Sequence, residues 1–122
     1  MKSYTDLDQS CILAEILPLD SADYFYRRFI DNFNAIQYTL ELYPYSKGAD
    51  KIHDLPCWSL SALLDALPRI EHLRPSIDLN PKLDSNEVAI YYHSEDSPYI
   101  VKDNLIDAAF AMAMWLKENK KI

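Results

Sequence analysis

Apolar residues recur with helical spacing near the start of the chain. Thr5 and Asp8 resemble a capping box, and the apolar residues that follow keep the period of one helix face. Proline cannot continue a helix, because its ring clashes with the preceding turn. We therefore expect a first helix that runs to about Leu17 and ends before Pro18.

The same period returns in the middle of the chain and at its end. Four leucines follow Ser59 at positions i, i+3, i+4 and i+7, with Pro68 as the terminator, and predict a short second helix. A third helix is predicted after a cap at Asp103 or Asn104. Its acidic first turn and the lysines of its last turn both suit the helix dipole.

The third predicted helix is apolar nearly all the way round. Between Leu105 and Leu116 only Asp107 interrupts the apolar residues, whereas a helix on a protein surface keeps a polar face. Protein must therefore cover both sides of this helix. Two alternatives remain open: the helix lies in the core of its own domain, or it is shared with a second subunit.

Alternation of apolar and polar residues, the period of a strand, predicts a first hairpin. Residues 24–30 and 36–42 both alternate, and the turn-forming residues 31–34 lie between them. The following segment, residues 45–54, contains the single glycine, Gly48, and is predicted as a surface loop.

A second hairpin is predicted from residues 77–79 and 88–92, with a turn at Asp84, Ser85 and Asn86. Together these segments predict an α+β protein with three helices and two antiparallel hairpins, in the order α-ββ-α-ββ-α. The sheet is expected to be covered on one face by the helices. Since 122 residues is close to the commonest domain size, residues 1–122 are expected to form a single domain.

Composition fits a folded chain, and the net charge disfavours one class of partner. Hydrophobic residues make up 49% of the chain and charged residues 25%, as in ordinary soluble domains. The formal net charge is −7. This charge repels a phosphate backbone, so we expect no nucleic-acid partner.

The N-terminal segment and the length of the apolar runs predict a cytoplasmic protein. The polar N-terminal segment lacks the apolar stretch of a secretory signal, and the longest apolar run, residues 108–116, is too short for a bilayer. We therefore expect no membrane partner. Cysteines stay reduced in the cytoplasm, so Cys11 and Cys57 are expected to be packed free thiols rather than a disulfide.

Residues suited to catalysis or metal binding are few. Phosphate-cradling loops and nucleophile elbows need glycines that this chain lacks. His53, Cys57 and His93 are residue types that a zinc site or a cysteine nucleophile uses. Pro56, however, prevents a regular helix from presenting His53 and Cys57 together. We expect no catalytic residue, no metal and no cofactor.

Aromatic residues give the one positive indication of function. The chain has nine tyrosines and two tryptophans, and such side chains supply large contact areas at recognition surfaces. Strands also favour tyrosine for packing alone. The predicted interaction surface lies on the strands and the last helix and consists of Tyr24, Tyr26, Tyr38, Tyr91, Tyr92, Phe110, Met114 and Trp115.

Three segments resemble a known family: YTDLDQSCILAEILPLDSADYFY (4–26), CWSLSALLDALP (57–68) and DNLIDAAFAMAMWLKENKKI (103–122). They are similar to short proteins without an assigned activity from Bacteroides-type gut bacteria, often found near phage or other mobile-element genes. Members of that family carry a cysteine where this chain has Ala109, and an acidic residue where it has Phe110 or Ala111. The resemblance therefore implies relatives and no catalytic site.

Three hypotheses for the function follow. We favour a non-enzymatic binding or accessory protein, mobile-element borne and self-associating, because catalytic motifs are missing, tyrosine is abundant and the last helix is apolar on both sides. One alternative is a small enzyme or ligand-binding domain with a pocket near Cys57, His53 and His93. Another is an acidic inhibitor of a nucleic-acid-binding protein.

Overall fold

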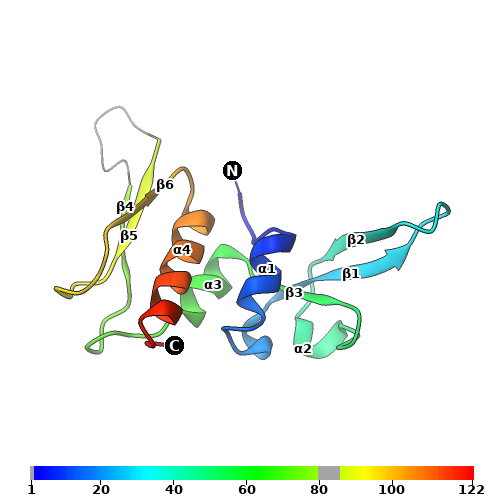
Figure 1. Ribbon diagram of the computed structural model, residues 1–122, viewed down its shortest axis with the longest axis horizontal. Coiled ribbons are helices and arrows are strands. Elements are labelled where there is room, and N and C mark those ends of the chain that lie inside the picture. The colour runs from blue at the N-terminus through cyan, green and yellow to red at the C-terminus, as the bar shows by residue number, and fades with distance from the viewer. Residues whose placement is uncertain (1, 80–85) are drawn as a thin grey trace.

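The computed structural model describes residues 2–79 and 86–122, and it places helices between two sheets (Figure 1). The elements follow in the order α1 (Leu7–Leu13), η1 (Leu19–Ser21), β1 (Tyr24–Ile30), β2 (Ile36–Glu41), α2 (Tyr45–Gly48), β3 (Leu55–Cys57), α3 (Leu60–Ala66), β4 (Ser76–Leu79), β5 (Val88–Tyr91), β6 (Ile100–Lys102) and α4 (Leu105–Glu118).

The predicted α+β class and both predicted hairpins are confirmed. β1 pairs with β2, and β4 pairs with β5, in antiparallel fashion. The strands form two sheets rather than one, in the orders β2-β1-β3 and β4-β5-β6. Figure 1 shows these sheets at opposite ends of the molecule, with α1, α3 and α4 between them.

Each hairpin has a third strand that the sequence pattern does not predict. β3 and β6 are three residues long, too short to show a period of two. β3 also contains Pro56, which lies opposite Phe25. Proline is tolerated there because this pair of the ladder exchanges no hydrogen bonds, so no N–H is needed.

The first helix differs from its prediction at both ends. Asp6, rather than Thr5, is the N-cap: Asp6 Oδ1 accepts the N–H of Gln9 at 2.8 Å, and Gln9 Oε1 accepts the N–H of Asp6 at 3.2 Å. Thr5 is fully buried instead. The helix ends at Leu13, and a turn that includes a bond from Leu17 N–H to Leu13 O carries the chain to Pro18.

The other two predicted helices are confirmed. Ser59 caps α3 by accepting the N–H of Ala62, and Asn104 caps α4 by accepting the N–H of Asp107 at 2.8 Å. The segment predicted as a loop, residues 45–54, contains the short helix α2. The turn predicted at Asp84 lies outside the described residues.

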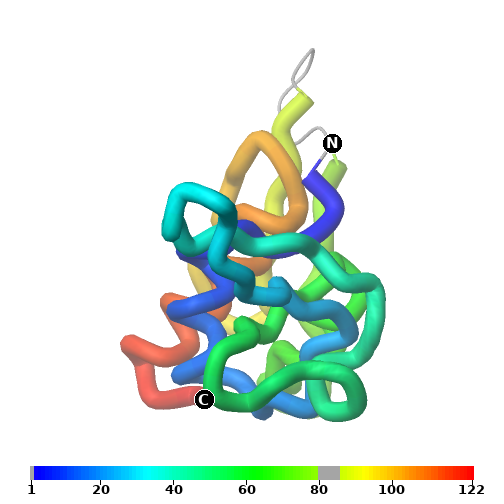
Figure 2. The backbone as a smooth tube through the Cα atoms, turned by 90° about the vertical axis from the view of Figure 1, so that its right-hand side faces the viewer, coloured from blue at the N-terminus to red at the C-terminus, as the bar shows by residue number. Residues whose placement is uncertain are grey.

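The core joins the helices to both sheets and covers α4 from within the chain. Six residues of α4 are buried: Ile106, Ala108, Ala109, Met112, Ala113 and Leu116. They belong to a cluster that also includes Phe25, Trp58 and Ile90. α4 contacts β5, β6, α3 and α1, and Figure 2 shows it beside α1. The chain itself therefore supplies most of the cover that the apolar sequence of α4 requires.

Both cysteines are free thiols. Cys57 is fully buried, as expected. Cys11 was expected to be packed but is exposed, because α1 turns Gln9, Ser10 and Leu13 inward instead.

Candidate functional site

A two-stranded arm projects from one end of the molecule. β3 pairs with residues 24–26 of β1, whereas β1 and β2 stay paired as far as Ile30 and Ile36. We name residues 27–40, the part of this hairpin beyond the end of β3 together with Leu40 at its base, the arm. Figure 1 shows it extending away from the helices, and in Figure 2 it points toward the viewer.

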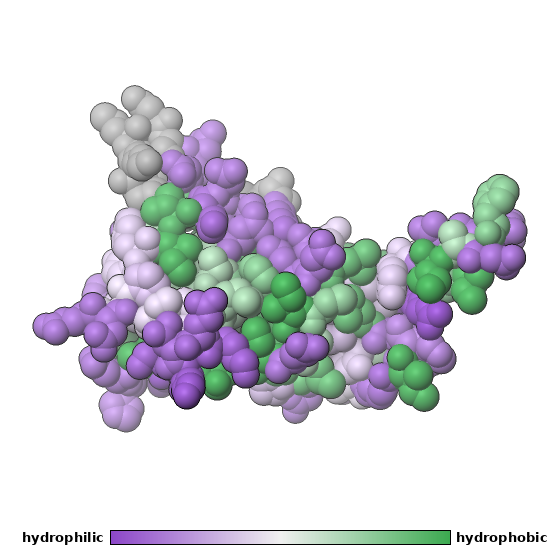
Figure 3. Space-filling view, in the orientation of Figure 1, coloured by the Kyte–Doolittle hydropathy of each residue, from purple (hydrophilic) through white to green (hydrophobic). Residues whose placement is uncertain are grey.

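Large apolar side chains are exposed on the arm. Phe33 at its tip is 90% exposed, Ile30 61% and Ile36 54%, and Phe29 and Tyr38 are also exposed. Figure 3 shows hydrophobic side chains gathered on this projection. Soluble monomers rarely expose several large apolar side chains together unless the surface binds something. The arm is therefore the candidate functional site.

The two faces of the arm differ in polarity. Directly opposite residues of an antiparallel pair place their side chains on the same face. One face is apolar except for a single arginine and consists of Arg28, Ile30, Ile36, Tyr38 and Leu40. The other face is mixed and consists of Arg27, Phe29, Gln37 and Thr39. We name the first set the apolar face of the arm.

One carboxylate holds the tip of the arm. Asp31 Oδ1 accepts the N–H of Phe33 at 2.8 Å and the N–H of Ala35 at 3.0 Å. The bonds from Ala35 and Phe33 lower the pKa of Asp31. Asn34 completes the turn with a φ of 60°, a left-handed conformation that asparagine tolerates. The Asp31 carboxylate thus fixes the turn through backbone N–H groups. The Phe33 side chain takes no part in these bonds and stays in solvent.

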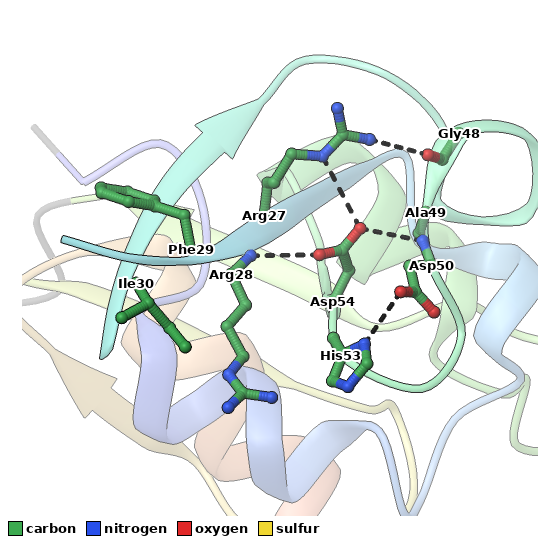
Figure 4. Close-up of a pocket in the computed structure, with 9 residues that line it drawn as sticks. All are labelled: Arg27, Arg28, Phe29, Ile30, Gly48, Ala49, Asp50, His53 and Asp54. Carbon is green, nitrogen blue, oxygen red and sulfur yellow. Dashed lines mark hydrogen bonds and ion pairs between the residues drawn. The ribbon is translucent and has the colours of Figure 1, made fainter. Parts of the chain in front are cut away.

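A groove of about 470 Å³ lies at the base of the arm (Figure 4). It is lined by residues 27–30 of β1 and by the segment that precedes β3. Asp54 Oδ1 accepts the N–H of Arg28 at 3.0 Å, and its Oδ2 accepts the N–H of Asp50 at 2.8 Å. The Asp54 side chain is only 4% exposed. Asp54 therefore takes the hydrogen-bonding position that a longer β3 would fill.

His53 and Asp50 form a polar pair in the same groove. His53 Nδ1 lies 2.9 Å from Asp50 Oδ2, and this bond lowers the pKa of Asp50. The described residues that line the groove include no serine, threonine, cysteine or lysine. Among the lining residues, the pair therefore has no hydroxyl, thiol or amine side chain to activate.

The structure gives Cys57, His53 and His93 separate surroundings. Cys57 Sγ lies in the core, 3.6 Å from Thr5 Oγ1, and burial raises the pKa of its thiol. His93 follows β5 in the other sheet, with its ring centroid 5.1 Å from that of Tyr91. Since a thiol with a raised pKa is a poor nucleophile, these residues do not form the catalytic arrangement considered from the sequence.

The predicted tyrosines are divided between surface and core. Tyr38 lies on the apolar face of the arm. Tyr24 is half-buried, with its ring edge-on to Tyr4, and Tyr91 is half-buried with its ring against Tyr99. These three tyrosines remain accessible to a partner.

Tyr26 and Tyr92 are buried instead. The Tyr26 hydroxyl donates to Thr5 O at 2.6 Å, and the Tyr92 hydroxyl donates to Pro68 O at 2.6 Å. Burial raises the pKa of Tyr26 and raises the pKa of Tyr92 to about 12. Both residues therefore pack and bond within the core and contribute nothing to the surface predicted for them.

The predicted residues of α4 are partly accessible. Phe110, Met114 and Trp115 are half-buried and line a groove of about 580 Å³. Lys2 and Asp107 line the same groove, and Lys2 Nζ donates to Asp107 Oδ1 at 2.8 Å. This salt bridge ties the N-terminal segment to α4.

Ile30, Phe33 and Ile36 carry the exposed apolar surface but are absent from the predicted interaction surface. Alternation along a strand does not tell whether both faces of a hairpin stay in water. The available signal was an aromatic residue, Phe33, among turn-forming residues, since turns normally carry polar side chains.

Within residues 2–79 and 86–122, no three His, Cys, Asp or Glu side chains are placed to hold a metal ion. None of the helices in those ranges combines the length and apolar character that crossing a bilayer requires.

No family model, curated protein or solved structure matches the chain. The resemblance to the Bacteroides-type family therefore stays a prediction.

Proposed function

We propose that this chain is a non-enzymatic binding protein that makes protein–protein contacts through the arm. The observation that carries the proposal is the exposure of Ile30, Phe33 and Ile36 on a hairpin that no other described strand covers beyond the end of β3. Removing apolar surface from water is favourable by about 25 cal/mol per Å². A partner that covers these side chains therefore gains binding free energy.

The construction of the arm also supports binding. A two-stranded hairpin by itself is at best marginally stable in water. Here Asp31 holds the turn at the tip, and Asp54 bonds the backbone at the base. A binding segment that is already ordered loses less conformational entropy when it associates. The two carboxylates thus preorganise the arm for contact.

The alternatives have less support. For an enzyme, the groove residues place no hydroxyl, thiol or amine side chain beside His53, and Cys57 is buried. An acidic inhibitor would present carboxylates to its target, whereas the one carboxylate of the arm, Asp31, is bonded to the backbone of its own turn.

Photo-crosslinking from two equally accessible positions tests the proposal. One full-length variant carries p-benzoylphenylalanine in place of Phe33, which is 90% exposed. The matched control carries it in place of Ile52, which is 84% exposed and lies outside the arm. Both variants are produced in the cells that naturally make the chain, irradiated, and analysed by mass spectrometry.

We expect defined protein adducts from position 33 that position 52 does not give. Random collisions would label both positions alike, because their exposure is similar. Identical adducts from the two positions, or none from position 33, would overturn the proposal.

A further inference from the structure

The two long edges of the arm are not equivalent. The β1 edge is closed where β3 ends, because Asp54 accepts the N–H of Arg28. β2 is the outermost strand of its sheet and pairs with β1 alone among the described strands. Natural proteins usually protect such an edge from pairing with another chain by placing a proline, a lysine or another charged residue on it. β2 has no lysine or proline, and its one charged residue is Glu41 at its end.

The free backbone groups of β2 belong to alternate residues. Asp31 N–H donates to Ala35 O at 2.9 Å, one step beyond the pair Ile30 and Ile36. In an antiparallel ladder this makes Ile30 and Ile36 a non-hydrogen-bonded pair, and the same holds for every second pair after it. The N–H and C=O groups of the even-numbered residues of β2 therefore face away from β1.

The order of apolar and polar residues from Ile36 to Leu42 is symmetrical about Thr39. The apolar residues are Ile36, Tyr38, Leu40 and Leu42, and they alternate with Gln37, Thr39 and Glu41. Antiparallel pairing of two such segments centred on Thr39 places apolar residues opposite apolar residues and polar residues opposite polar ones. The backbone groups also match, because each pair of outward-facing residues is even-numbered.

Other registers match less well. An axis moved to Tyr38 keeps the faces aligned but places Glu41 opposite Ala35 and leaves Leu42 opposite Asn34. A shift by one residue brings apolar side chains of one copy to the polar face of the other. The axis at Thr39 pairs every residue from Ile36 to Leu42 with one of like polarity, whereas an axis at Leu40 places Gln37 opposite Tyr43 and Ile36 opposite Pro44.

We propose that the partner of the arm is a second copy of this chain, paired through the two β2 strands about a twofold axis at Thr39. The proposal rests on the proposed function and names its partner. The pairing extends the β2-β1-β3 sheet across both copies. It places Leu42 of the second copy directly beside Ile36, on the face of the extended sheet that also carries Ile30, so that exposed apolar side chains cover one another.

The charge of the chain predicts how this association responds to salt. Each copy carries a formal net charge of −7, so the two copies repel each other at long range. Salt shortens the screening length to about 8 Å at 0.15 M. Pairing by hydrogen bonds and apolar contacts should therefore strengthen as salt is added, whereas association driven by opposite charges would weaken.

Sedimentation velocity of the full chain tests the self-pairing. At about 0.1 mM the dimer is populated for any dissociation constant below that value, and we expect twice the 14.2 kDa mass of one chain. Thr39→Lys and Thr39→Glu each place two like charges opposite one another only in the proposed dimer. Each should weaken association about tenfold or more, and an equimolar mixture of the two should restore it.

A second lysine variant is the matched control. Gln37→Lys adds the same charge two residues away on the same exposed face, but it faces Glu41 of the second copy in the proposed register. It should leave the dimer intact or strengthen it. Equal weakening by Thr39→Lys and Gln37→Lys would overturn the register.

Oxidative crosslinking tests the same register, because a disulfide traps the dimer even where it is weakly populated. In a Cys11→Ser background, Thr39→Cys should form a disulfide-linked dimer, because its partner cysteine lies directly opposite. Gln37→Cys should not, because four residues of strand separate it from its own counterpart. A strictly monomeric parent at about 0.1 mM, or no Thr39→Cys disulfide, would overturn self-pairing. A monomeric chain that still gave Phe33 adducts with another protein would leave the proposed function in place.

Discussion

Asp54 should be the residue that keeps the base of the arm folded. The loss of stability that its removal causes can be calculated from its contacts. Its carboxylate is nearly inaccessible to solvent, at 4% exposure, and accepts the N–H groups of Arg28 and Asp50. A hydrogen bond to a charged group contributes about 1.5–3 kcal/mol. Part of that gain offsets the cost of burying the carboxylate. We therefore expect Asp54→Ala to lower the free energy of unfolding by about 3 kcal/mol.

That loss converts into a shift of the melting temperature. An unfolding entropy of about 2.1 cal/mol/K per residue gives about 0.26 kcal/mol/K for 122 residues. Asp54→Ala should then melt about 12 °C below the parent. The amides of Arg28 and Asp50 should also exchange with solvent about 100-fold faster, since each tenfold change corresponds to about 1.4 kcal/mol.

Two variants separate the hydrogen bonds from the loss of charge. Asp54→Asn keeps one carbonyl oxygen as an acceptor and should lose about half as much stability. Asp20→Ala removes a carboxylate that is exposed and should stay within about 0.5 kcal/mol of the parent. The reasoning fails if Asp54→Ala melts together with Asp20→Ala, or if its Arg28 amide exchanges at the parental rate.

Two further outcomes follow from the burial and charge of single residues. Cys11 is exposed, whereas Cys57 is buried and has a raised pKa, so a thiol reagent at neutral pH should modify one cysteine of the native chain. The Cys11→Ser variant should therefore not react with the reagent while it is folded. Rapid labelling of Cys57 in that folded variant would contradict this prediction. The hydrogen bond from Lys2 lowers the pKa of Asp107 below its ordinary value of 3.8. Its contribution to stability is therefore present above that value and is lost as pH falls through the lower, folded-state pKa. Asp107→Asn should flatten the acid side of a stability–pH curve measured by urea unfolding, and identical curves for variant and parent would refute this.

The elements that the sequence predicted correctly are those whose signals are local. The Ser59 and Asn104 caps, and the long apolar run of α4, specify α3 and α4 within a few residues of chain. The first hairpin is equally local, because Asp31 bonds the turn and alternation marks both strands. Such signals predict the structure correctly because their hydrogen bonds join residues within one turn of chain.

The surface was decided by tertiary structure. Tyr26 and Tyr38 lie in the same hairpin and on the same face, yet Tyr26 is buried and bonded to Thr5 while Tyr38 is exposed. The difference is that the N-terminal segment and β3 reach one end of the hairpin only. Sequence period gives the face of a strand, but it does not tell how far along the strand a partner extends.

The arm itself arises in the same way. Residues 24–30 and 36–42 predict a hairpin. How much of that hairpin lacks a third strand depends on where β3 stops, at Leu55 opposite Tyr26. This pairing joins residues about thirty positions apart, and no local pattern encodes it. The sequence by itself determined the hairpin, its turn and its polarity. Only the long-range pairing and packing of β3 decided which part of the hairpin projects into water and which part is core.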